Sequence, residues 1–345
     1  IAGGWEMAEA EDVEMSASAP AGAPAAAINA PVVDLTLPFP PASYEVLWIV
    51  GLDGSQLSYR CLRLVAMTMK LSGGKHKLLA LNMAKSGDPE NSKIFNEAET
   101  QARAAGVNMF KSFSTKSLKI PDGWSLVDTL VYFANHTARF RGRLVLGAKG
   151  LTGADQPKMD RLGHVALSCL DRVKVPVTIV KEAWRGASGD HNAMGRIMRV
   201  GRNGLPGLTI VVTIDGTDIS LRAFDYAADL VRPKDRLICL HVESSGDRHL
   251  APELQTHYTT ELGKIEQSVK EASTEFTIIP RTGSALSDDI VSYCEKISAD
   301  LIVLGSVELS KPVRGEKLKL GSVASAIAKG TAKCHFAVIK NTSLV

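Results

Sequence analysis

Two stretches of the sequence resemble each other and decide the fold. Tyr44–Ser58 reads YEVLWIVGLDGSQLS, and Gly207–Ser220 reads GLTIVVTIDGTDIS. In each stretch a short, largely β-branched apolar run leads to Asp-Gly and a hydroxyl residue. Such a run is too short for a helix, so each stretch predicts a buried strand that ends at an aspartate. Asp53 aligns with Asp215 at an offset of 162 residues.

Four further landmarks repeat in the same order at offsets of 158 or 159 residues. They are KLLALNM (Lys77–Met83) with RLICLHV (Arg236–Val242), RLVLG (Arg143–Gly147) with DLIVLG (Asp300–Gly305), GHVA from Gly163 with GSVA from Gly321, and VTIVK (Val177–Lys181) with FAVIK (Phe336–Lys340). A nearly constant offset is the signature of an internal repeat. We therefore predict two homologous domains, at 44–181 and 207–345, joined by a Gly-, Arg- and Asn-rich linker at 182–206.

Apolar runs alternate with amphipathic stretches in each unit. In the first unit we expect strands at 46–50, 78–81, 107–113, 144–146 and 175–180, and helices at 57–69, 95–105, 126–137 and 162–173. Continuously apolar strands that alternate with helices indicate a parallel sheet covered on both faces. The fold class is therefore α/β, with two tandem doubly wound five-stranded parallel-sheet domains and an irregular N-terminal tail.

Residues 1–43 differ from the rest of the chain. This segment contains 12 Ala and 6 Pro, six acidic residues and no Lys or Arg, whereas the remainder carries 40 basic and 31 acidic residues. With little to bury, the segment cannot offset its ordering entropy alone. We expect it to order against a protein partner, such as a large assembly, or against its own body. It lacks the Arg-rich composition of a transit peptide and the apolar run of a secretory signal.

Composition excludes several function classes. The chain has 345 residues, 45% hydrophobic and 22% charged, which suits globular domains, and its apolar runs are too short to span a membrane. Five scattered cysteines and eight histidines show no metal-ligand spacing and no disulfide framework. No nucleic-acid motif accompanies the basic body. We expect a cytoplasmic protein, with an organelle matrix as the alternative.

Ligands of open parallel sheets bind beyond the carboxyl ends of the strands. At those ends the sequence places two aspartates, two glycines after the fourth strands and two glycines that open the last helices: Asp53, Asp215, Gly147, Gly305, Gly163 and Gly321. A helix start with free N–H groups favours an anion. No GxGxxG follows either first strand and no GxxxxGK[ST] occurs, which argues against a Rossmann dehydrogenase and a P-loop NTPase.

These residues resemble the universal stress protein family, in which a strand ends in Asp-x-Ser, a second ends in His-Val, and G-x2-G-x9-G-[ST] follows the fourth. Here the strand ends read LDGS from Leu52, IDGT from Ile214 and LHV from Leu240. The resemblance covers about residues 44–181 and 207–341. It implies an adenine-nucleotide alpha-hydrolase-like, Rossmann-like fold. In that family the last strands pair across a dimer, so the resemblance implies that Val175–Val180 pairs with Phe336–Lys340 as an intramolecular pseudo-dimer, which would also cover two edge strands that invite association. It also implies that the aspartate and the second strand hold adenine and ribose, while the glycine loop wraps the phosphates of ATP or AMP with Mg2+.

The resemblance carries these roles onto eleven positions, at the strand ends and glycine loops of both repeats. They are Asp53, Gly54, Met83, Gly147, Gly150 and Gly163 in the first repeat, and Asp215, Val242, Gly305, Gly321 and Ser322 in the second. Both repeats depart from the pattern. Twelve residues, rather than nine, separate Gly150 from Gly163 and Glu308 from Gly321. In the first repeat His164 replaces the hydroxyl residue, and in the second Glu308 replaces the second glycine of the loop. A carboxylate beside a phosphate is repulsive.

Each feature has a structural alternative. The aspartates could cap the helices that follow them, and the glycines could serve tight turns. The basic residues of the two loops, Lys149, Lys158, Arg161, Lys311, Arg314, Lys317 and Lys319, could contact phosphates or form a solvated face. No catalytic constellation emerges, and a phosphate-accepting receiver domain is excluded because Leu52 and Ile214, not acids, precede the aspartates.

Two readings remain open. In the first, the chain is a non-enzymatic tandem universal stress protein that binds ATP or AMP in its first domain and has a sensing or regulatory role in a stress response. In the second, both domains have lost nucleotide binding, no cofactor is bound, and the chain is a structural scaffold of a larger assembly anchored by its tail. Slow ATP hydrolysis is a third option that would need a base and a metal ligand not evident in the sequence.

Overall fold

The computed structural model describes residues 33–40, 43–69, 75–83, 89–137, 141–149, 162–181, 207–244, 246, 250–282, 285–306, 320–329 and 334–340. Contacts divide the chain into residues 1–32 and 33–345, and all described helices and strands belong to the second unit. Most of the predicted N-terminal extension and all of the predicted linker at 182–206 lie outside the described residues.

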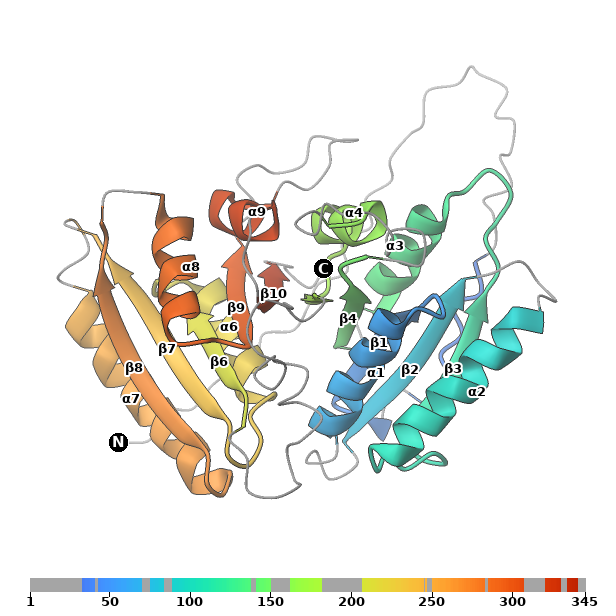
Figure 1. The fold of residues 1–345 in the computed structure, drawn as a ribbon, viewed down its shortest axis with the longest axis horizontal. Helices are drawn as coiled ribbons and strands as arrows, with labels where there is room; N and C mark the ends of the chain where they lie inside the picture. Colours follow the sequence, from blue (N-terminus) through green and yellow to red (C-terminus); the bar gives the residue numbers. More distant parts are fainter. Residues whose placement is uncertain are drawn as a thin grey trace, which may run out of the picture. The chain divides into compact units, whose positions relative to one another are not determined.

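One sheet of ten strands runs through the described residues in the order β3-β2-β1-β4-β5-β10-β9-β6-β7-β8 (Figure 1). The first half contributes β1 (Val46–Leu52), β2 (His76–Met83), β3 (Phe113–Leu118), β4 (Gly142–Gly147) and β5 (Val177–Val180). The second contributes β6 (Thr209–Thr213), β7 (Arg236–Glu243), β8 (Ser273–Pro280), β9 (Leu301–Ser306) and β10 (His335–Lys340). Each half has the same internal strand order, which confirms the predicted α/β class with five parallel strands per half.

Helices cover both faces of this sheet (Figure 1). They are α1 (Gln56–Met69), α2 (Pro89–Ala104), α3 (Leu126–His136) and α4 (His164–Arg172) in the first half, and α6 (Asp218–Ala228), α7 (Ala251–Ser268), α8 (Leu286–Lys296) and α9 (Ser322–Lys329) in the second. Within the first half, β1 is the middle strand. It is buried along almost its whole length because helices cover the apolar side chains on both of its faces.

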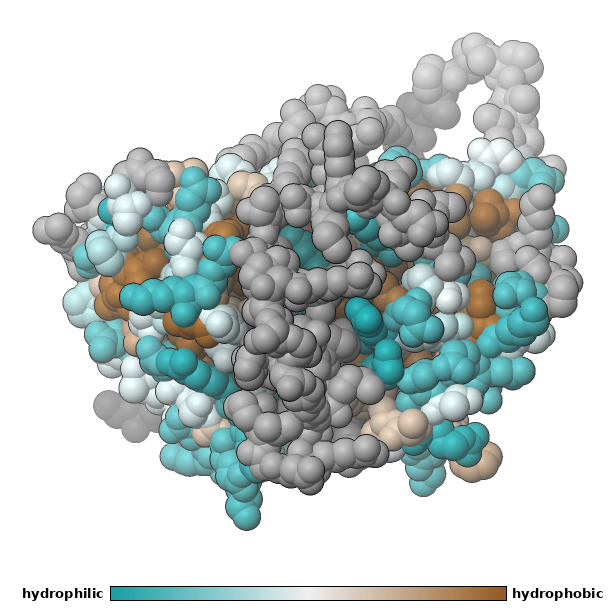
Figure 2. Space-filling view, in the orientation of Figure 1, coloured by the Kyte–Doolittle hydropathy of each residue, from teal (hydrophilic) through white to brown (hydrophobic). Residues whose placement is uncertain are grey.

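The described surface leaves few large apolar side chains in water. Phe110, Tyr132, Leu221 and Ile278 are the exposed ones among the described residues. On the face shown in Figure 2, apolar residues appear as separate patches among hydrophilic ones. Within the described part of the chain, no helix combines the length and apolar character needed to cross a bilayer.

The predicted third strand is wrong. We expected it at Val107–Phe113, but β3 begins only at Phe113. The side-chain oxygen of Asn108 accepts hydrogen bonds from the N–H groups of Phe110 and Lys111, which fold this apolar run into a turn. The true strand is rich in Ser and Thr, since it lies at the edge of the sheet and buries only its two end residues completely.

The two halves join through β5 and β10, as the resemblance stated above implies. These strands are antiparallel, with Ile179 opposite Phe336, Thr178 opposite Ala337 and Val177 opposite Val338. Every other strand pair described in the sheet is parallel. The repeat offset of 159 residues makes Thr178 and Ala337 equivalent, so an approximate two-fold axis passes through this pair. We call the contact of the two halves around β5 and β10 the seam.

The described end of the N-terminal extension packs on the first half. Val33 and Phe39 are buried, and Leu35 and Leu37 contact the core. Lys116 of β3 donates to the Asp34 carboxylate at 2.7 Å and to the carbonyl of Thr36 at 2.6 Å. The hydrogen bond from Lys116 is the main reason that the pKa of Asp34 falls to about 2. This part of the extension therefore rests on its own body.

His335 begins β10 inside the seam. Its Nδ1 accepts a hydrogen bond from the backbone N–H of Lys181 at 3.1 Å, so this nitrogen carries no proton. Its Nε2 is buried without a hydrogen-bond partner in the structure. Burial, helped by the charges of Lys181 and Arg60, lowers the pKa of His335 from 6.5 to about 4. The folded protein therefore holds a neutral imidazole at the seam.

We predict that His335 makes the free energy of unfolding depend on pH. Between pH 6.5 and about 4 the unfolded chain binds a proton at this residue and the folded chain does not. The contribution of His335 to stability therefore falls as pH drops from about 6.5 to about 4 and is constant below. The loss attributable to His335 is about 3 kcal/mol. Urea unfolding of His335→Gln across this range should show a flatter profile than the wild type. The exposed His257→Gln control should follow the wild type; equal profiles for all three proteins would contradict the prediction.

Candidate functional site

Three predicted site residues of the first half meet at one edge of the sheet. The pairing of Leu52 with Asn82 places the next residues, Asp53 and Met83, side by side. The β1–β4 register pairs Val50 with Val145, and its continuation by two residues brings Gly147 beside Leu52. The carboxyl ends of β1, β2 and β4 therefore gather Asp53, Met83 and Gly147, as expected for parallel strands.

The second half repeats this arrangement. Thr213 pairs with Leu240, so continuation of the β6–β7 register places Asp215 beside Val242. The β6–β9 register pairs Val212 with Val303 and by the same continuation brings Gly305 to this edge. Asp215 is exposed, whereas Asp53 is partly buried.

The aspartates do not cap the helices themselves, which corrects the structural alternative derived from the sequence. Asp53 Oδ1 accepts from the backbone N–H of Ser55 at 2.9 Å, and Ser55 Oγ in turn accepts from the N–H of Ser58 at 3.1 Å in the first turn of α1. In the second half Thr217 is the N-cap of α6, and Asp215 accepts from its N–H at 3.0 Å and its hydroxyl at 2.6 Å. Each aspartate thus orients the capping residue.

The glycine between aspartate and cap is needed for the turn. Gly54 and Gly216 have φ angles of 82° and 83°, which other residues adopt only with strain. We assigned Gly54 to the ligand site by resemblance; the structure supplies a backbone reason for it.

The glycines that end β4 and β9 have a packing reason. A Cβ on Gly147 would lie 3.0 Å from Leu57 Cγ, and one on Gly305 would lie 2.8 Å from Ile219 Cγ2. Leu57 and Ile219 belong to the first helix of each half, so these glycines let that helix approach the sheet. The reason is close helix packing rather than the tight turn considered as the alternative.

Gly163 differs because nothing in the described structure requires a glycine there. It is the N-cap of α4 with φ −64° and ψ 158°, a conformation open to all residues, and it makes no side-chain cap. A Cβ at this position would meet Ala148 O at 3.4 Å, an ordinary contact. Its own N–H donates to that oxygen at 2.7 Å, and its carbonyl accepts from Leu167. A side chain at this position would therefore meet the described residues only at ordinary contact distances.

The equivalent helix start in the second half is filled differently. The hydroxyl of Ser306, a buried residue, accepts the N–H of Gly321 at 3.0 Å. Ala148 occupies the aligned position of the first half and offers only its backbone oxygen. Ser322 is the first residue of α9. Sequence reasoning did not single out Ser306, although Gly-Ser against Gly-Ala in the two repeats was the available signal.

His241 also escaped the sequence analysis as a site residue. It precedes Val242 on β7, is almost fully buried, and its Nδ1 lies 2.9 Å from the carbonyl oxygen of Ile214. Because a carbonyl only accepts, Nδ1 carries a proton. Nε2 is buried and has no hydrogen-bond partner in the structure. The second site thus has a buried imidazole where the first has Asn82.

The phosphate side of both predicted sites is only partly described. His164 is exposed at the first position of α4, and Lys149 is half-buried after β4. Gly150, Glu308 and the remaining basic loop residues, Lys158, Arg161, Lys311, Arg314, Lys317 and Lys319, lie outside the described residues. Among the residues that are described, no three or more His, Cys, Asp or Glu side chains are grouped to hold a metal ion.

Comparison with known proteins identifies a related family for the second half. Residues 208–340 match the model of the universal stress protein family. A universal stress protein from Archaeoglobus fulgidus DSM 4304 has 18% sequence identity, covers 86% of this chain and 98% of its own, and superposes with a TM-score of 0.55. That likeness shows a shared fold across both halves. A search of curated proteins found no match.

Two smaller solved proteins are also similar. A universal stress protein in complex with cAMP has 25% identity and covers 40% of this chain and 98% of its own, with a TM-score of 0.31. A universal stress protein family protein from Arabidopsis thaliana with AMP bound has 18% identity and covers 39% of this chain and 93% of its own, with a TM-score of 0.27.

The contrast between the two kinds of glycine can be tested by stability. Gly147→Ala should lower the free energy of unfolding by about 1–3 kcal/mol, because its methyl group would lie 3.0 Å from Cγ of the buried Leu57, which would have to shift within a packed core. Gly163→Ser should leave stability unchanged or raise it by a few tenths of a kcal/mol, because serine is a good N-cap. Urea unfolding of both variants measures this difference. Equal destabilisation would show that Gly163 also serves packing.

Proposed function

We propose that the first half of this chain binds an adenine nucleotide at the carboxyl ends of β1, β2 and β4, and that the chain acts as a non-enzymatic sensor or regulator. The observation that carries the proposal is Gly163, a glycine at a helix start that neither its backbone conformation nor any contact with the described residues requires. Space in front of a helix N-terminus, where N–H groups and the helix dipole point outward, suits a phosphate.

The other end of the ligand would lie at Asp53 and Met83. These residues sit side by side at the strand ends, and Asp53 uses one carboxylate oxygen to hold Ser55. The adenine specificity rests on the resemblance to universal stress proteins, whose family model matches the second half. Asp53 and the backbone of Met83 would contact base and ribose, while the start of α4 would contact the phosphates.

The second half is the weaker binder in this proposal. Ser306 places its hydroxyl against the N–H of Gly321, so a side chain already stands at the start of α9. The acidic Glu308 follows in the loop sequence. The second candidate function is a scaffold that binds no nucleotide in either half. The Ser306 hydroxyl at the start of α9 favours it for the second half, and a failure of the first half to bind would extend it to the whole chain.

The test is calorimetric titration of the full chain with ATP and AMP, each with and without Mg2+. We expect binding that Gly163→Asp weakens at least about tenfold, because a carboxylate at the helix start repels phosphate. Aspartate is also a favourable N-cap, so the variant should fold. Gly163→Asn is the matched control: it has the same shape and capping preference without the charge, and should bind more tightly than Gly163→Asp.

A second pair of variants assigns the binding half. Asp53→Ala should weaken nucleotide binding, whereas Asp215→Ala at the equivalent exposed position should leave it unchanged. A binding heat that is lost in Asp215→Ala and kept in Asp53→Ala would show that the nucleotide binds to the second half. No heat and no thermal stabilisation with either nucleotide would overturn the proposal and favour the scaffold.

A further inference from the structure

An arginine crosses the seam between the two halves. The Arg143 side chain of β4 is 12% exposed and forms an ion pair with Asp229, which follows α6 in the other half. Its guanidinium lies 5.0 Å from the Trp48 ring centre and 4.5 Å from that of Tyr226. The Tyr226 hydroxyl is 2.5 Å from Thr178 Oγ1 of β5. We call these five side chains the arginine cluster.

The approximate two-fold axis shows that this cluster has no counterpart. The repeat offsets make Leu301 equivalent to Arg143, Leu64 equivalent to Tyr226 and Met67 equivalent to Asp229. All three equivalents are apolar, so they can form neither the ion pair nor a cation–π contact. The arginine cluster therefore exists on one side of the axis only.

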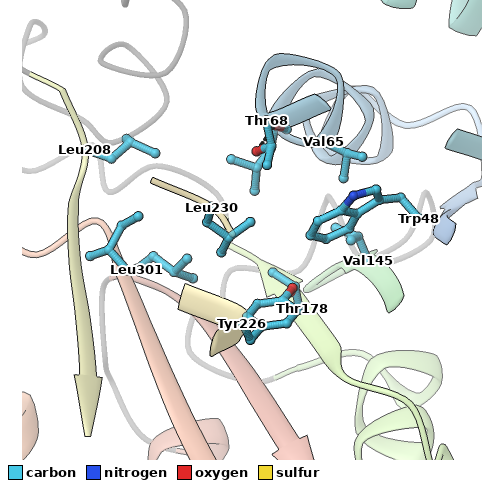
Figure 3. Close-up of a pocket in the computed structure, with 11 residues that line it drawn as sticks. Trp48, Val65, Thr68, Val145, Thr178, Leu208, Tyr226, Leu230 and Leu301 are labelled. Atoms are coloured by element: carbon cyan, nitrogen blue, oxygen red, sulfur yellow. Dashed lines mark hydrogen bonds between the residues drawn. The ribbon is translucent and has the colours of Figure 1, made fainter. Parts of the chain in front are cut away.

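An apolar contact occupies the other side. Leu64 and Leu301 line a cavity of about 20 Å³ at the seam. Its lining includes three equivalent pairs, namely Trp48 with Ile210, Leu64 with Tyr226 and Thr68 with Leu230. In Figure 3, labelled side chains of both halves face this space, among them Trp48, Tyr226 and Leu301. The cavity thus spans the axis and borders both kinds of contact.

We propose that the arginine cluster makes the seam selective, so that the first half fits the second half and rejects a second copy of itself. The pairing of β5 with β10 does not by itself select the second half over another first half. Val177 faces Val338 and Ile179 faces Phe336, and the two pairs are exchanged by the approximate two-fold axis. Two first halves could therefore pair along β5. The side chains beside the strands decide the partner.

In a pair of first halves, Arg143 would face Leu64 and Met67 of the other copy, and would do so twice. Each guanidinium would then be buried without a carboxylate, the costly outcome for a charge removed from water. Even when the first half pairs with the second, one Arg143 nitrogen is buried without a hydrogen-bond partner. The guanidinium therefore depends on its ion pair with Asp229 to offset the loss of water. Arg143 therefore destabilises a pair of first halves and stabilises the pairing of the first half with the second.

A pair of second halves is rejected less strongly. Leu301 would face Tyr226 and Asp229 of the other copy. Asp229 is 45% exposed in the structure, so water can solvate its carboxylate when Arg143 is absent. Selectivity therefore resides mainly in the surface of the first half.

The test must break the covalent connection, because a linker keeps the halves of one chain at high effective concentration. A protease site is placed within residues 182–206 of the full chain, and the folded protein is cleaved there. Cleaved chains with a tag on the first half are mixed with untagged cleaved chains. A parallel mixture with two different tags on the second halves shows that halves exchange between molecules under the same conditions. The tagged first halves are then captured and their partners are counted by mass spectrometry.

We expect captured wild-type first halves to carry second halves, with untagged first halves in fewer than about 1 in 100 complexes. Arg143→Leu, which installs the equivalent residue of the second half, should raise that fraction at least tenfold. Arg172→Leu is the matched control, since this arginine pairs with Asp128 of its own half. Wild-type first halves that pair with each other at the random share, or no rise with Arg143→Leu, would overturn the proposal.

A second variant guards against misfolding of Arg143→Leu. Asp229→Asn keeps the arginine and removes its carboxylate partner. It should speed exchange of the halves several-fold without increasing first-half pairs, because the unpaired guanidinium still rejects them. Increased first-half pairing in Asp229→Asn would contradict the role of Arg143, whatever the behaviour of the leucine variant.

Discussion

The antiparallel pairing of β5 with β10 is the contact on which the rest of this molecule depends. Each half is a parallel sheet that ends in a strand with one unpaired edge, and an unpaired edge is costly to leave in an apolar interior and prone to association in water. Joining the two edges makes one continuous ten-stranded sheet. It also creates the environment that keeps His335 neutral and brings Arg143 against Tyr226.

The two halves share most of the backbone hydrogen bonds and close contacts at the carboxyl ends of their strands. Asp53 and Asp215 make the same kind of hydrogen bond to the capping residue of the next helix. Gly147 and Gly305 allow the same close approach of that helix. At the start of the last helix the halves differ, because the N–H of Gly163 donates to the backbone oxygen of Ala148 whereas that of Gly321 donates to the Ser306 hydroxyl. The helix start can therefore change without a change in the strand ends beside it.

Much of this architecture could be predicted from the repeat, and the failures have physical causes. The buried strands were evident because they are continuously apolar, but β3 was misplaced because an edge strand needs few apolar residues. The aspartates were placed correctly at the strand ends, yet the helix caps proved to be Ser55 and Thr217. That distinction depends on which oxygen lies within hydrogen-bond distance of which N–H, and spacing alone does not reveal it.

The sequence by itself determined the duplication, the parallel strand–helix units and the gathering of Asp53, Met83 and Gly147 at one edge. These features result from local periodicity and from the rule that parallel strands end together. Only the tertiary structure decided that Arg143 meets Asp229, 86 residues away in the other half. It also decided that a Cβ at Gly163 would make only ordinary contacts with the described residues. Such facts depend on which surfaces come into contact once the sheet is complete, and the periodicity of one segment carries no information about them.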